Sequence, residues 1–197
     1  MASLQPDAGI AGPRLLATNF HDNRIDVFDD QFTLLPDTSM FRDPSLPAGY
    51  APFNVAVIGG QVFVTYALRD ADAHDDVAGP AHGFVDVYTS EGAFARRFAT
   101  HGVLNSPWGM TIAPATFGQF AGDLLIGNFG DGRIHALNPN TGEVLGILRG
   151  TNGAPVVIDG LWGLLVGDAV AGGPDAVWFS AGPDDESHGL LGILRAS

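Results

Sequence analysis

The chain has 197 residues, the length of one large β domain, and 22 acidic residues against nine basic ones give a net charge of −13. All nine basic residues are Arg, and no Cys is present. Because the chain has no basic run, we expect no nucleic-acid partner, and the absence of Cys excludes disulfides and thiolate-bound metals. The acidic composition and the lack of a long apolar run predict no membrane partner, and no signal peptide is recognisable near Met1.

Short sequence motifs recur along the chain. Residues 19–28 align without gaps on residues 128–137, and both segments begin with Asn-Phe and continue through Arg-Ile. A second motif places Phe53, Trp108 and Trp162 in the same register, 55 and 54 residues apart. A constant spacing of this kind indicates repeated supersecondary units.

Each repeat divides into short strands with alternating apolar residues. After an N-terminal segment, 1–13, which is a candidate closing strand, the first unit (14–47) has predicted strands at 14–20, 24–29 and 32–36. The second unit (48–103) has strands at 53–58, 61–67, 83–89 and 94–99. The third unit (104–157) has strands at 108–113, 123–128, 133–138 and 144–149, and the fourth (158–197) has strands at 161–167, 176–181 and 189–194.

Repeated units of four antiparallel strands are typical of β-propeller blades. The sequence therefore predicts an all-β propeller of about four blades, the first and the last incomplete; a β-sandwich is the alternative fold. Unpaired blade edges invite association. The units could form part of a six-bladed propeller, close through residues 1–13, or pair with a second copy through their exposed edges.

Several of these motifs resemble an uncharacterised family of bacterial β-propeller proteins with NHL-like repeats. The resemblance is carried by residues 16–21, 48–54, 74–80, 105–109, 127–134, 158–162 and 180–183. It covers nearly all of 14–195 but only the C-terminal half of a typical member. Family members are often exported, some with a PEP-CTERM sorting signal, so the resemblance implies a secreted or periplasmic bacterial protein and no established activity.

The propeller interpretation places the loops between second and third strands, and the connections between blades, on one face. The long loop 69–82 is the most acidic of these segments, and 183–188 occupies the equivalent place in the last unit. Carboxylates at alternate positions suit Ca²⁺, whereas a mixture of His and carboxylates suits a transition metal; the alternative is a solvated turn capped by its own Asp side chains. The candidate metal ligands are Asp70, Asp72, His74, Asp75, Asp76, His82, Asp184, Asp185 and Glu186.

Three loop histidines, His21, His74 and His188, are candidate catalytic residues. If they converged on the axis they could hold a catalytic metal or act as general bases. The alternative for each is an exposed histidine of a loop.

A second set of residues on the same face suits an organic ligand. Aromatic rings at the start of the innermost strands either pack between blades or form a rim for a sugar. The candidate ligand-binding residues are Tyr50, Phe53, Asn105, Trp108, Asp131, Asp159 and Trp162.

We therefore expect an exported module that binds a small molecule, a saccharide or a protein on its loop face. Ca²⁺ or another divalent metal is the expected cofactor, and no motif for a nucleotide or haem is present. The alternative function is a metal-dependent lyase or hydrolase that uses the His and Asp residues of the loops.

Overall fold

A computed structural model describes residues 2–4, 12–36 and 39–196 of the chain. These residues form fourteen strands and one short 3₁₀ helix, η1 (Gly118–Phe120). The structure is thus all-β, as predicted, and no helix in these described ranges is long and apolar enough to cross a membrane.

The strands form four antiparallel sheets, each built from strands that follow one another in the sequence. The first sheet contains β1 (Ala2–Leu4), β2 (Arg14–Asn19) and β3 (Arg24–Phe28). The second contains β4 (Tyr50–Ile58), β5 (Gln61–Leu68), β6 (Phe84–Tyr88) and β7 (Phe94–Thr100). The third contains β8 (Pro107–Ile112), β9 (Leu124–Asn128), β10 (Ile134–Leu137) and β11 (Val144–Ile147). The fourth contains β12 (Leu161–Val166), β13 (Val177–Ala181) and β14 (Leu190–Leu194).

Tight turns explain why neighbouring strands pair. Between β4 and β5, Ile58 pairs with Gln61 across a two-residue turn in which Gly59 and Gly60 both have positive φ, 57° and 78°. Two central residues of positive φ give the twist that a two-residue hairpin requires, and Gly adopts this conformation without a steric penalty.

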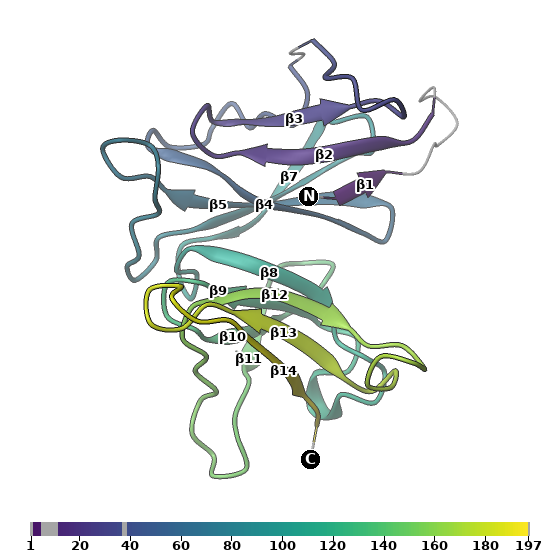
Figure 1. The fold of residues 1–197 in the computed structure, drawn as a ribbon, viewed down its shortest axis with the longest axis vertical. Helices are drawn as coiled ribbons and strands as arrows, with labels where there is room; N and C mark the ends of the chain where they lie inside the picture. Colours follow the sequence, from purple (N-terminus) through teal and green to yellow (C-terminus); the bar gives the residue numbers. More distant parts are fainter. Residues whose placement is uncertain (1, 5–11, 37–38, 197) are drawn as a thin grey trace.

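The four sheets pack face against face in sequence order. The inner strands form the series of contacts β2 with β4, β4 with β8, and β8 with β12. Figure 1 shows the first two sheets, with β1–β5, in the upper half of the view and the last two, β8–β11 and β12–β14, overlapping in the lower half. Three apolar clusters fill the successive sheet-to-sheet interfaces, and Leu16, Val85 and Leu125 are fully buried in them. The predicted all-β propeller architecture of about four blades, with the first and the last incomplete, is therefore confirmed.

The first sheet differs in composition from the prediction. Ala2–Leu4 pair with Arg14–Leu16, so β1 is an additional strand beside β2 within its own sheet. The predicted strand 32–36 is reduced to one bridge between Phe28 and Leu34. Phe32, with a positive φ of 60°, belongs to the turn after β3, and hydrogen bonds from the Asp29 amide to Thr33 and from the Leu35 amide to Val27 flank the bridge.

Candidate functional site

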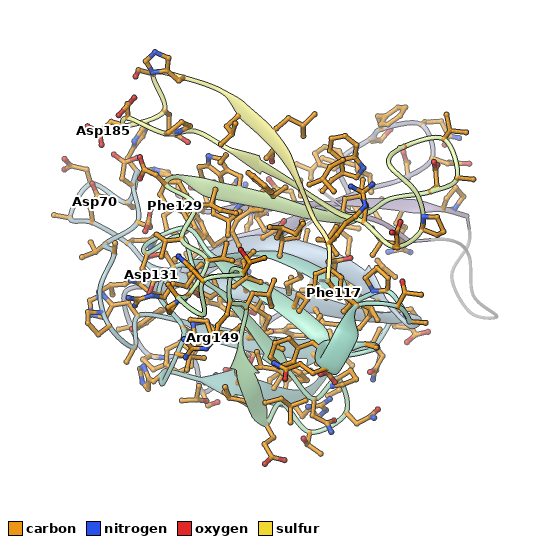
Figure 2. All side chains as sticks on the ribbon, turned by 90° about the horizontal axis from the view of Figure 1, so that it is seen from below. Asp70, Phe117, Phe129, Asp131, Arg149 and Asp185 are labelled. Atoms are coloured by element: carbon orange, nitrogen blue, oxygen red, sulfur yellow. The ribbon has the colours of Figure 1, made fainter. Side chains whose placement is uncertain are left out.

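The loops that follow β2, β5, β9 and β13 lie on one face, and we call it the loop face. Asp70, Phe129, Asp131 and Asp185, which belong to three of these loops, all lie on the left side of Figure 2. Neighbouring loops contact one another there: Nδ1 of His21 is 3.2 Å from the carbonyl oxygen of Ala73. The antiparallel order of the strands brings these loops together, as the sequence indicated.

The long loop, residues 69–82, bridges several sheets. Nη1 of Arg69 donates to the carbonyl of His21 in the first sheet at 2.7 Å. Its other end is held by the third sheet, because the Gly79 amide donates to Oδ1 of Asn105 at 2.7 Å. The long loop therefore crosses the loop face from the first sheet towards the third.

Most acidic residues of the long loop are solvated or form hydrogen bonds within the loop. Oδ1 of Asp70 accepts a hydrogen bond from the His74 amide at 2.8 Å, and this bond leads the interactions that lower the pKa of Asp70. Asp72 and Asp75 are exposed, and Asp75 contacts the imidazole of His74 at 3.1 Å. The His82 ring contacts the carbonyl of Val77 at 2.8 Å. These contacts match the capping role that Asp residues play in turns.

The second acidic loop has a similar local organisation. Asp184, Asp185 and Glu186 all have positive φ, between 52° and 61°, and are exposed. Nδ1 of His188 lies 3.4 Å from Oδ2 of Asp184 and 3.0 Å from Oγ of Ser187. Over the described ranges, no three His, Asp or Glu side chains come together in a group that could hold a metal ion. The calcium site, the metal-dependent enzyme and the three catalytic histidines stay predictions.

Five aromatic rings, which we call the aromatic cluster, form a connected series on the loop side of the inner strands. The cluster consists of Phe20, Phe53, Trp108, Phe129 and Trp162. Phe53 lies 5.2 Å from Phe20 and 5.8 Å from Trp162 between ring centroids, so rings of the first, second and fourth sheets meet. Phe129 and Trp162 are 4.2 Å apart, and Trp108 and Trp162 are 5.3 Å apart. All five rings are half-buried.

A pair of buried polar groups lies beside the aromatic cluster. Oδ2 of Asp76 and Oγ of Ser106 are both buried without a well-formed hydrogen bond, and Ser106 is fully buried. Burial raises the pKa of Asp76; the nearby Ser106 hydroxyl opposes this shift, while the charges of Asp75 and Glu186 reinforce it. A buried polar atom without a partner costs free energy, so such atoms often mark a place where a ligand or water binds.

Backbone and side-chain contacts tie this polar pair to the aromatic cluster. The carbonyl of Ser106 accepts a hydrogen bond from the Phe129 amide at 2.9 Å. Nε1 of Trp162 donates to Oε1 of Glu186 at 2.5 Å, and the charge of this Glu186 adds to the effect of burial in raising the pKa of Asp76. Ser106 is therefore joined to Phe129 through the backbone, and Asp76 interacts electrostatically with the Glu186 that binds Trp162.

The remaining predicted ligand-binding residues have other roles. Tyr50 is buried against Phe84, with ring centroids 4.7 Å apart, and burial raises the pKa of its hydroxyl. Asp131 accepts from Nδ2 of Asn128 at 3.1 Å, and Asp159 accepts from the Asp184 amide at 3.1 Å. Asn105 anchors the long loop. These residues shape the loops around the aromatic cluster.

Some members of this site were candidates from the sequence and others were not. Phe53, Trp108, Trp162 and Asp76 were predicted, whereas Phe20, Phe129 and Ser106 were missed. The repeat itself contained the signal for the two Phe residues, because Asn19-Phe20 and Asn128-Phe129 share one register. Ser106 had no such signal, since only the contact with the long loop buries its hydroxyl beside Asp76.

Comparisons with known proteins place this fold. No family model matches the chain. The uncharacterized protein L690 of Acanthamoeba polyphaga mimivirus is 36% identical over 192 residues, which is 94% of this chain and 50% of that protein. The mimivirus protein R648 is also 36% identical, over 94% of this chain and 46% of its own length. The chain thus spans about half the length of these relatives.

Among solved structures, a gluconolactonase from Xanthomonas campestris, XC5397, matches 92% of this chain and 58% of its own, with a TM-score of 0.57 at 20% identity. A streptogramin B lyase matches 92% of this chain and 51% of its own, with a TM-score of 0.49 at 14% identity. The likeness to the gluconolactonase supports the β-propeller fold. Both relatives named above are viral proteins, so the expected bacterial origin, export and sorting signal gain no support and stay predictions.

Proposed function

We propose that this chain is part of a β-propeller module that binds a small polyhydroxylated molecule, such as a saccharide, at the centre of its loop face. The observation that carries the proposal is the aromatic cluster together with two buried polar atoms, Oδ2 of Asp76 and Oγ of Ser106, which interact with each other but have no well-formed hydrogen bond. Ligand sites typically combine an apolar wall with a few convergent polar groups.

The aromatic cluster and the polar pair of Asp76 and Ser106 together suit a polyhydroxylated ligand. Half-buried rings such as Trp162 offer an apolar surface on which the C–H face of a sugar can stack. The carboxyl oxygens of Asp76 can accept hydrogen bonds from ligand hydroxyls, and the hydroxyl of Ser106 can both donate and accept. Burial raises the pKa of Asp76, so a ligand hydroxyl that donates to its carboxyl would replace part of the water that burial has removed.

The test is a titration of the full chain with glucose and with glucono-δ-lactone, the compound class for which the Xanthomonas neighbour is named. We expect saturable heat release in calorimetry with at least one of the two probes. Replacing Trp162 by Ala should weaken binding at least about fivefold, since a stacked aromatic contact contributes on the order of 1 kcal/mol or more.

A matched control is Trp178→Ala, because Trp178 is also half-buried but belongs to the exposed face of the fourth sheet. This variant should bind as tightly as the unaltered chain. The proposal fails if neither probe binds to the folded chain, or if Trp162→Ala and Trp178→Ala weaken binding equally.

A further inference from the structure

The faces through which the four sheets pack are built from equivalent positions. The strand pairings align Leu16, Phe63, Leu125 and Trp178 as one position of the second strand of each sheet. They likewise align Ile25, Val85, Ile134 and Leu191 as one position of the third strand. Because side chains alternate along a strand, these two positions lie on the same face of each sheet.

In the first three sheets this face packs on the following sheet. Leu16 and Ile25 are buried together with residues of the second sheet, such as Val64. Leu125 and Ile134 are both fully buried, in a cluster with Leu161 and Leu164 of the fourth sheet. We call this the forward face of a sheet.

The forward face of the fourth sheet is open. Leu191 is 67% exposed, whereas its equivalents Val85 and Ile134 are fully buried. Leu165 is 69% exposed, and an apolar hollow of about 430 Å³ is lined by Leu165, Trp178, Phe179 and Leu191, with no charged side chain among its lining residues. Exposed apolar surfaces of this kind mark interaction sites.

The other face of each sheet, which in the later sheets packs on the preceding sheet, we call the rear face. Ala17 is equivalent to Val64 and Ile126, both fully buried against the preceding sheet. Asp26, the pairing partner of Ala17, is equivalent to the buried Asp86, the pairing partner of Val64. Each of these aspartates is paired with an Arg of its own sheet: Arg24 with Asp26 at 2.6 Å, and Arg97 with Asp86.

The rear face of the first sheet thus repeats the pattern of a face that is buried elsewhere in the molecule. Ala17 is half-buried because no described sheet precedes it. The first and fourth of the described sheets therefore present two faces that are complementary to each other by the same rule that packs the sheets between them.

We propose that the open forward face of β12–β14 in one copy of this chain packs against the rear face of β1–β3 in a second copy, as one blade packs against the next. Such a contact is heterologous, and two copies related by a twofold axis can form it twice. It differs from pairing through strand edges, because it buries the apolar hollow at Leu191 and Trp178. The proposal does not depend on the proposed ligand site.

The experiment measures the mass of the full chain by size exclusion with light scattering over a range of concentrations. We expect at least twice the mass of one chain. Leu191→Arg, on the forward face, and Ala17→Arg, on the rear face, should each give the mass of one chain. Both positions are solvent-accessible, so these variants should keep the circular dichroism spectrum of the unaltered protein.

Mixing the two variants tests the direction of the contact. The Ala17→Arg chain has an intact forward face and the Leu191→Arg chain an intact rear face, so their mixture should recover a pair with twice the mass of one chain. Leu145→Arg, an exposed leucine on the outer strand β11, is the control and should leave the mass of the assembly unchanged.

Three results would overturn the proposal. One is an unaltered chain that has the mass of one chain at every concentration. The second is an Ala17→Arg variant that still associates, which would mean that two forward faces pack together. The third is a mixture of the two variants that shows no association.

Discussion

Asp86 is a carboxyl buried in the interior of the second sheet. It shares the guanidinium of Arg97 with Asp43, and the side chains of both aspartates are fully buried. One positive charge cannot neutralise two carboxylates. Burial therefore raises the pKa of Asp86 to about 7; Arg97 opposes the shift, and the neighbouring Asp43 reinforces it.

This shift predicts a pH-dependent stability. The unfolded chain releases the Asp86 proton near 3.8, whereas the folded chain keeps it up to about pH 7. Between these values the folded state binds more protons, so the free energy of unfolding should fall as pH rises, by up to about 1.4 kcal/mol per pH unit. Urea denaturation over this interval measures the slope.

Replacing Asp86 by Asn should flatten that slope, because the amide does not titrate. The exposed Asp30 provides the control, and Asp30→Asn should leave the slope unchanged. If the slope of Asp86→Asn equals that of the unaltered chain, another group causes the dependence.

At the scale of the elements, the turn between β9 and β10 is in close, hydrogen-bonded contact with the connection that leads into β12. Gly132 has a φ of 65°, and its carbonyl accepts from the Ile158 amide at 2.9 Å. A Cβ at this position would lie 2.2 Å from the carbonyl oxygen of Ile158, which is far inside a van der Waals contact. The glycine is therefore required by its conformation and by this close approach.

Gly132→Ala should consequently destabilise the chain more than a change of conformation alone would. Gly153 also has a positive φ, of 76°, but a Cβ added there would meet no atom within 4 Å, so Gly153→Ala isolates the conformational cost of about 1–2 kcal/mol. We expect Gly132→Ala to exceed that loss by at least about 1 kcal/mol in chemical denaturation. Equal losses would show that the turn yields to the added methyl group.

At the scale of the whole molecule, residues at equivalent positions of the sheets are buried where another sheet packs on them and exposed where none does. Leu125 and Trp178 share one register, yet Leu125 is fully buried between two sheets. Leu191 is exposed because no sheet among the described residues follows the fourth. Burial between sheets is therefore the main contribution of these positions to stability.

Leu125→Ala should lower the free energy of unfolding by about 2–5 kcal/mol, because it leaves a cavity between the third and fourth sheets. Leu191→Ala, measured at a concentration at which the chain is monomeric, should lower it by less than about 1 kcal/mol. Denaturation curves of the two variants give the comparison, and equal losses would contradict this account of the interfaces.

Much of this architecture could be predicted from local signals. Alternating apolar residues and Gly-Gly, Asn-Pro and Asn-Gly-type turns specify antiparallel strands, and the repeat register specifies that Phe53, Trp108 and Trp162 occupy equivalent places. The strand at 32–36 was wrong in extent because pattern alone cannot detect the positive φ of Phe32. The pairing of Ala2–Leu4 with β2 depends on contacts across an intervening segment, which no local pattern records.

Side-chain alternation and turn chemistry within each repeat were enough to define the strands, their order and the face on which the loops gather. Which residues of that face meet depends instead on packing between sheets. Asp76 and Ser106 are 30 positions apart, and Phe53 and Trp162 come from sheets that are not adjacent in sequence order. The Asp residues behind the strong negative charge fall into two groups in the structure. Most Asp side chains of the long loop are solvated, whereas Asp76 and Asp86 are partly or fully buried. Packing between loops and strands decides which carboxyls lose their water.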